Sequence, residues 1–177
     1  MSDHHPTSGG HAVLLVGVPE LERWVRTRTS EQDASFVSSD PEFAHAHITV
    51  LAPFPGDGFA QAEAVASAVA PFDYSLAQVR AFPTGVIYLP PFPDAGFRAL
   101  TDAARRAVPE VAPYWGLFDP VPHLTLDRIG RGITRETTGA AVAGLLPVSC
   151  RAERLLLTWW ESDGCRVLAS YPLGGSR

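Results

Sequence analysis

The sequence of 177 residues predicts an α+β fold with two lobes, each a small antiparallel sheet covered by helices on its outer face, and an active cleft between the lobes. Apolar segments of strand length alternate with amphipathic helical patterns along the chain. A short polar strand pattern, His-x-Thr, occurs once in each half and follows a helix both times, which suggests a pseudo-repeat. We expect a single domain over residues 11–173, preceded by a disordered tail over residues 1–10.

The first half of the chain is expected to begin with a strand over 11–18, where the residues form an apolar run. Pro19 suits the first turn of a helix over 19–32, whose apolar residues recur at helical spacing. A turn cluster then precedes the first His-x-Thr strand at about 44–51. A second helix, also with an apolar stripe, ends before Pro71.

The second half is expected to contain more strands. Asp94 can cap its first helix and Pro109 stops that helix. The expected order is strands 74–82 and 85–89, a helix between Asp94 and Pro109, an irregular aromatic and proline-rich segment over 113–122, the second His-x-Thr strand at 123–129, a helix at about 134–146, and a closing hairpin of 150–160 with 165–172.

The two His-x-Thr patterns are the candidate catalytic residues. Side chains two apart in a strand point to the same face, so His47 emerges with Thr49, and His123 with Thr125. Two imidazoles can supply one neutral ring that accepts a proton and one charged ring that donates a proton. One such pattern alone is more often a hydrogen-bonded polar pair in a strand, but two copies in apolar strands favour a catalytic role.

These motifs resemble those of the 2H phosphoesterase superfamily, particularly its branch of 2′-5′ RNA ligases and 2′,3′-cyclic nucleotide phosphodiesterases. The matching residues are HITV at 47–50 and HLTL at 123–126, with Pro53-Phe54 after the first motif and Pro122 before the second. The resemblance extends over most of the chain, from about residue 11 to residue 173. It implies the same bilobal arrangement, with one His-x-Thr from each lobe facing across the cleft.

The predicted activity is hydrolysis of the 2′,3′-cyclic phosphate of a nucleotide or RNA end without a metal or other cofactor. One histidine removes the proton of a water molecule and the other protonates the leaving ribose oxygen. The hydroxyls of Thr49 and Thr125 donate to the nonbridging oxygens. With a 5′-hydroxyl in place of water as the nucleophile, the same site makes a 2′-5′ linkage. The sequence does not assign the base and the acid to His47 and His123.

Two alternatives remain open. His45 lies on the same strand face as His47, so that His45, His47 and His123 offer a three-histidine metal site, although no carboxylate follows at ligand spacing. A catalytically idle nucleotide- or RNA-binding module is the other alternative, and a damaged motif would be its signature. Further candidates for substrate contacts are Phe54, Tyr88, Trp115 and His45, since aromatic rings can stack on a base.

Composition restricts the class of protein. The chain is 46% hydrophobic and 19% charged, as in globular proteins, and it has no apolar run long enough to span a membrane. Its net charge of −5 argues against nonspecific coating of nucleic acid. Cys150 and Cys165 lie too far apart on the predicted hairpin for a disulfide. We therefore expect a cytoplasmic monomer that acts on a nucleotide or RNA end.

Overall fold

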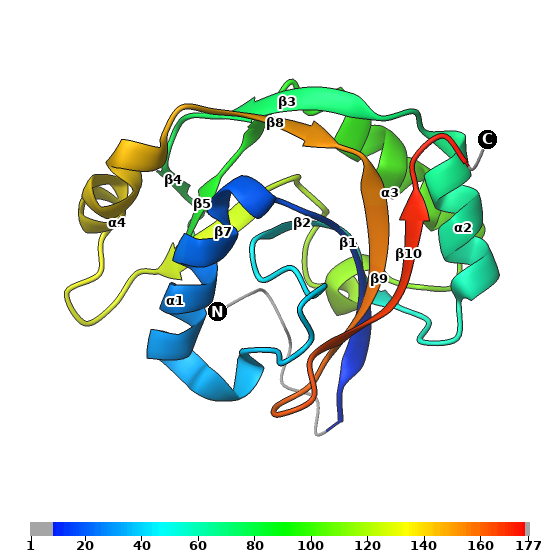
Figure 1. Cartoon of the computed structure of the whole chain (residues 1–177), viewed down its shortest axis with the longest axis horizontal. Helices are drawn as coiled ribbons and strands as arrows, with labels where there is room; N and C mark the ends of the chain where they lie inside the picture. The colour runs from blue at the N-terminus through cyan, green and yellow to red at the C-terminus, as the bar shows by residue number, and fades with distance from the viewer. Residues whose placement is uncertain (1–8, 176–177) are drawn as a thin grey trace.

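The computed structural model describes residues 9–175 and confirms an α+β fold with two antiparallel sheets (Figure 1). Residues 1–8 of the expected tail lie outside this range. The strands are β1 (His11–Gly17), β2 (His47–Phe54), β3 (Phe72–Leu76), β4 (Arg80–Ala81), β5 (Val86–Leu89), β6 (Pro91–Phe92), β7 (Leu124–Arg128), β8 (Val148–Ala152), β9 (Arg154–Trp160) and β10 (Arg166–Pro172). The α-helices are α1 (Glu22–Asp33), α2 (Phe59–Ala68), α3 (Ala95–Ala107) and α4 (Arg135–Val142). Short 3-10 turns are η1 (Pro19–Leu21), η2 (Ala34–Phe36), η3 (Pro113–Gly116) and η4 (Ala143–Leu145).

The two sheets are unequal in size. One has seven strands in the order β10-β9-β1-β2-β7-β5-β4, and the other has three in the order β6-β3-β8. Both His-x-Thr strands, β2 and β7, therefore lie in the same sheet, whereas we expected one motif in the sheet of each lobe. They pair at Ile48 and Leu124. This pairing covers the edge that β2 would otherwise leave open, and it joins the two halves of the large sheet.

Two of the predicted strands are each divided between the sheets. Residues expected as one strand over 74–82 form β3 in the small sheet and β4 in the large one, and 150–160 form β8 and β9 in the same way. The buried positions show the reason for the second division. In β8 the even-numbered residues Cys150 and Ala152 are buried, whereas in β9 the odd-numbered residues Leu155 and Leu157 are buried. One continuous strand would bury residues of the same parity throughout, so the chain must change direction or sheet at the junction.

The first motif strand also differs from its expected bounds, because β2 begins at His47 and continues through Pro53 to Phe54. Pairing with β1 is irregular at this end: Leu14 faces Leu51 and Ala12 faces Phe54, so two residues of β2 oppose one of β1. Such a bulge tolerates a residue without an N–H group. Pro53 therefore does not end the strand.

The large sheet has a different apolar cluster on each face, as the alternation in β1 shows. Leu14 and Val16 belong to the main core, whereas Val13 and Leu15 belong to a smaller cluster that includes Trp160. Helix α3 packs near β2, where the Thr101 hydroxyl donates to the Val50 carbonyl at 2.9 Å. No helix within residues 9–175 is long and apolar enough to cross a bilayer.

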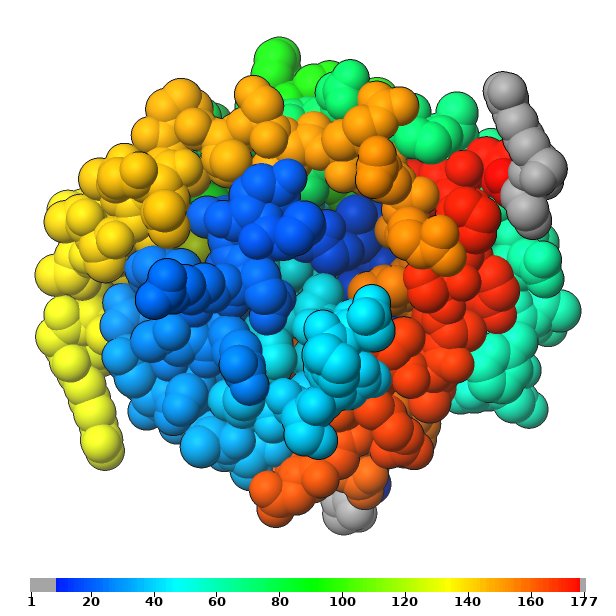
Figure 2. Space-filling model, viewed as in Figure 1, coloured from blue at the N-terminus to red at the C-terminus, as the bar shows by residue number. Residues whose placement is uncertain are grey.

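Helix α1 lies in front of the large sheet and near β7 (Figure 1). In the space-filling view, α1 and the chain leading from it to β2 cover the centre of this face, and the yellow and orange of α4 and β8 border α1 (Figure 2). Helix α1 thus lies over the large sheet beside β7, with α4 and β8 next to it.

Candidate active site

His47 is the first residue of β2, and its ring is held by the backbone just before it. The Nδ1–H group donates to the carbonyl oxygen of His45 at 2.8 Å. This bond assigns the hydrogen to Nδ1 and leaves Nε2 as the nitrogen that can exchange a proton with a substrate. The ring packs against Trp160 with centroids 5.0 Å apart and is 8% exposed.

His123, immediately before β7, is held by the same kind of bond. Its Nδ1–H group donates to the carbonyl oxygen of Val121 at 2.6 Å. Phe82 and Tyr88 stack on each other with centroids 3.8 Å apart, and both make T-shaped contacts with the His123 ring, at 5.2 and 5.8 Å. The two histidines therefore have the same tautomer, and both are buried among aromatic rings.

The register between β2 and β7 brings the two motifs together. Ile48 pairs with Leu124 in antiparallel strands, so one residue further along each strand His47 stands opposite Thr125 and His123 stands opposite Thr49. The two histidines are thus diagonal neighbours, a relationship with a typical spacing of about 7–8 Å. Within residues 9–175, no hydrogen bond occupies the hydroxyl of Thr49 or Thr125. A phosphate group between the rings would meet two imidazoles and two hydroxyl donors.

The electrostatic environment makes His47 a proton acceptor. Burial lowers its pKa to about 4, and the nearby His123 ring also lowers it, while the hydrogen bond to the His45 carbonyl and the charge of Glu22 act in the opposite direction. His47 is therefore neutral at pH 7. A neutral imidazole with a committed Nδ1 hydrogen can take a proton at Nε2.

Trp160 supports the His47 ring, and the sequence alone did not single it out. Its Nε1–H group donates to the Thr158 hydroxyl at 2.9 Å, and that hydroxyl donates to the Val13 carbonyl at 2.9 Å. Because Trp159 and Trp160 are neighbours in β9, they point to opposite faces of the sheet. Which of them reaches His47 depends on the pairing of β9 with β1.

The predicted substrate contacts fall in different places. Tyr88 adjoins His123 as described above, and Phe82, which the sequence analysis missed, lies with it. Trp115 packs against His11 at 5.2 Å. Phe54 is 4% exposed within the main core, so its ring is not available to stack on a base. Phe54 belongs to the same apolar cluster as Ile48 and Val50, which alternate with the motif residues along β2, so it lies on the face opposite the motif.

Both ring nitrogens of His45 are engaged in contacts within the protein. Nδ1 donates to Oε2 of Glu22 at 2.8 Å, and Nε2 accepts from the Ser38 N–H group at 3.0 Å. The three-histidine alternative is therefore not assembled. In the part of the chain that the structure describes, no three His, Cys, Asp or Glu residues are placed to hold a metal ion.

Asp127, two residues after Thr125, links β7 to two helices and is fully buried. Its Oδ1 accepts a hydrogen bond from Nε2 of Gln32 at 2.9 Å. The same oxygen lies 2.9 Å from Nε of Arg28 and forms an ion pair with it, although the Nε–H group does not point at the oxygen as a hydrogen bond requires. Its Oδ2 accepts from the Thr138 hydroxyl at 2.6 Å. The sequence does contain a signal for Asp127: it is the third polar residue, after His123 and Thr125, in a segment where polar residues recur at every second position.

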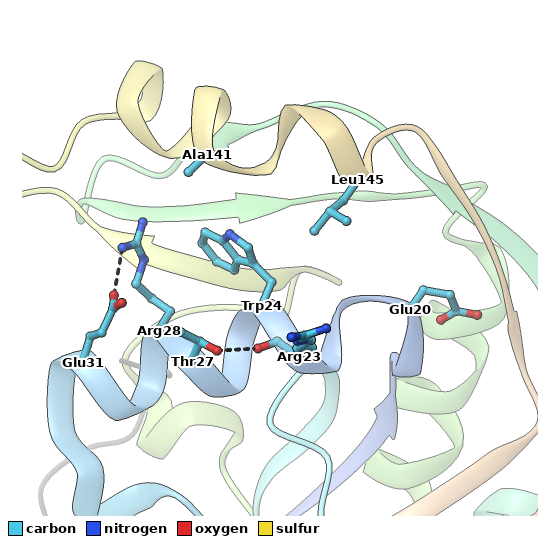
Figure 3. Close-up of a pocket in the computed structure, with 8 residues that line it drawn as sticks. All are labelled: Glu20, Arg23, Trp24, Thr27, Arg28, Glu31, Ala141 and Leu145. Carbon is cyan, nitrogen blue, oxygen red and sulfur yellow. Dashed lines mark hydrogen bonds and ion pairs between the residues drawn. The ribbon is translucent and has the colours of Figure 1, made fainter.

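A groove of about 480 Å³ lies between α1 and the segment of α4 and η4 (Figure 3). The Arg28 guanidinium lies over the Trp24 ring at 4.9 Å and also pairs with Glu31. The groove is lined by Glu20, Arg23, Trp24, Thr27, Arg28, Glu31, Ala141 and Leu145. No residue of either His-x-Thr motif is among them, so this groove is separate from the histidine pair.

Comparison with known proteins identifies the family of the chain and proteins with a similar fold. Residues 18–164 match the family model described as the 2′-5′ RNA ligase superfamily. The fold is similar to that of E. coli LigT complexed with 3′-AMP, with a TM-score of 0.60, 14% identity and coverage of 93% of this chain and 98% of LigT. It is also similar to the protein TT0787 of Thermus thermophilus, with a TM-score of 0.59, 22% identity and coverage of 94% and 100%. No curated protein matches the sequence.

Proposed function

The chain belongs to the 2′-5′ RNA ligase superfamily, and from this premise we propose that it is a phosphoesterase acting on the 2′,3′-cyclic phosphate of a nucleotide or RNA end. The observation that carries the proposal is the diagonal placement of His47 and His123 across one registered strand pair, each beside a threonine hydroxyl. The arrangement supplies acid–base groups and oxyanion donors from the protein itself, so the proposed reaction uses no metal.

In the proposed hydrolysis, Nε2 of His47 takes a proton from water as the water oxygen attacks phosphorus. The lowered pKa of His47 supports this assignment, because a general base must be unprotonated at the working pH. His123 gives its proton to the ribose oxygen as the P–O bond of the ring breaks. Thr49 and Thr125 donate to the nonbridging oxygens, where negative charge accumulates.

The proposed substrate class rests on the neighbours as well as on the site. Solved structures of LigT contain 3′-AMP, NADP+ and ATP, which are all nucleotides. In the present chain the stacked pair of Phe82 and Tyr88 lies beside His123 and can support a base by stacking. Ligation of RNA ends, in which a 5′-hydroxyl replaces water as the nucleophile and the P–O bond to the 3′-oxygen breaks to leave a 2′-5′ linkage, uses the same groups. We expect the protein to act as a monomer in the cytoplasm, where its two free thiols would stay reduced.

The test is an assay of 2′,3′-cyclic nucleotides, ADP-ribose cyclic phosphate and 2′-5′ oligonucleotides, each with excess EDTA. We expect turnover of at least one cyclic phosphate in EDTA, and none by the double variant His47→Ala/His123→Ala. Loss of turnover in EDTA that zinc or manganese restores would contradict the metal-free mechanism. Binding of the cyclic nucleotides by calorimetry without any turnover would instead identify an idle binding module.

A further inference from the structure

We propose that Glu22 is a positioning residue for His47 and acts through the peptide group that joins His45 to Ala46. The expected effect on kcat rests on the proposed function, whereas the positioning of the His47 ring does not. Glu22 is the first residue of α1, and nothing in the two His-x-Thr motifs points to it.

The proposed relay consists of two hydrogen bonds in series, one at the N–H and one at the C=O of the same peptide group. Oε1 of Glu22 accepts from the Ala46 N–H group at 2.9 Å. The carbonyl of the same peptide, on His45, accepts from Nδ1–H of His47 at 2.8 Å. A carboxylate and the imidazole are thus connected through the N–H and the C=O of one planar group.

Two hydrogen bonds in series hold the His47 ring more firmly than the bond to the carbonyl alone. Hydrogen bonds in series polarise one another, so a carboxylate bound at the N–H end makes the carbonyl at the other end a better acceptor. A stronger acceptor holds the Nδ1 hydrogen in place and stabilises the positive charge that His47 gains when Nε2 takes a proton. The charge of Glu22 also acts directly, because it raises the pKa of His47 against the larger effect of burial.

His45 holds the Glu22 carboxylate in this position. Its Nδ1–H group donates to Oε2 at 2.8 Å, while its Nε2 accepts from the Ser38 N–H group. Because Nε2 accepts, the hydrogen of the ring is at Nδ1, where it binds the carboxylate. The Glu22 side chain is 30% exposed, so two fixed contacts rather than burial order it. The charged or titratable groups that act on His47 are Glu22, His45 and His123.

The second motif lacks the group that this relay requires. Nδ1–H of His123 donates to the carbonyl of Val121, and the peptide of that carbonyl leads to Pro122. Proline has no N–H group, so no carboxylate can bind the far side of this peptide. The two histidines therefore have the same tautomer but unequal support. The difference fits a role for His47 as the residue that gains a proton in the proposed hydrolysis.

The test compares Glu22→Gln with Glu31→Gln, a matched change on the same helix at a residue that pairs with Arg28. Glutamine keeps an oxygen for the Ala46 N–H group but removes the charge. In Glu22→Gln we expect the Nδ1–H proton resonance of His47, observed by NMR at neutral pH, to move upfield. We also expect kcat on a cyclic nucleotide to fall about tenfold or more with KM little changed, as when the outer partner of a functional histidine is lost. Glu31→Gln should change neither quantity.

The NMR measurement separates this inference from the proposed function. If the wild-type protein hydrolyses no cyclic phosphate, the proposed function fails, while the His47 resonance still decides whether the relay exists. A folded Glu22→Gln protein with an unchanged His47 resonance, or with unchanged kcat in an active enzyme, would overturn the inference. If Glu22→Gln does not fold, the wild-type protein provides the test. In a pH titration of the wild-type protein, the Ala46 amide resonance must then shift with the same midpoint as the carboxylate carbon resonance of Glu22. An Ala46 resonance that does not shift with Glu22 refutes the relay.

Discussion

His47 and His123 are held by the same bond: each donates its Nδ1 hydrogen to the carbonyl oxygen two residues earlier, at 2.8 Å for His47 and 2.6 Å for His123. The bond fixes the tautomer and the direction of each ring before any substrate arrives. Such preorganisation lets Nε2 exchange a proton without prior rearrangement of the ring.

The histidine pair should act as one unit. We expect His47→Ala and His123→Ala each to lower kcat by roughly 10²–10⁴-fold, as for loss of a general acid or base. The double variant should be little worse than the poorer single variant, because groups that act in one step are not additive. Steady-state kinetics on a cyclic nucleotide provide the measurement. A folded single variant, checked by circular dichroism, with near wild-type turnover would contradict the assignment.

The two threonine hydroxyls should contribute mainly in the transition state. We expect Thr49→Val and Thr125→Val each to cost about 2–3 kcal/mol of transition-state stabilisation, as for loss of one donor to a developing oxyanion. The loss should appear in kcat rather than KM, since the hydroxyls meet more negative charge as the reaction proceeds. An increase in KM with unchanged kcat would show that the hydroxyls only bind the ground state.

The pH dependence should show the lowered pKa of His47. Its pKa is about 4, below the usual 6.5, so the neutral, proton-accepting form persists well below neutral pH. We expect log(kcat/KM) to keep its value as the pH falls past 6 and to decline only near pH 4, where His47 becomes protonated. An acid limb with its midpoint near the usual 6.5 would show that His47 is not the base, or that its ring is solvated.

Asp127 should be important for stability because it is a fully buried charge with three partners. Replacing it with Asn removes the buried carboxylate of its ion pair with Arg28, which then keeps only its pair with the more exposed Glu31. We expect a loss of about 3 kcal/mol in the free energy of unfolding, measured with urea. The matched control is Asp73→Asn, since Asp73 is 78% exposed in its ion pair with Arg151. That change should cost less than about 1 kcal/mol. Equal losses in the two variants would contradict the structural role assigned to Asp127.

The sequence by itself determined the α+β class, the helices and the residues of the candidate pair. These features depend on local patterns, because apolar spacing distinguishes helix from strand, and His-x-Thr in an apolar strand puts both polar side chains on one face. The same local patterns could not show where two expected strands divide between sheets. That division follows from which distant strand each half pairs with.

Only the tertiary structure decided which residues surround the histidines. Trp160 reaches His47 through the pairing of β9 with β1, and Phe82 reaches His123 from a separate segment. Glu22 is 25 residues before His47 in the sequence, and its contact with the 45–46 peptide exists because α1 folds back toward the start of β2. Such contacts join side chains that no local periodicity relates. They form because aromatic rings pack together and the buried Ala46 N–H group needs an acceptor, wherever the folded chain brings these groups.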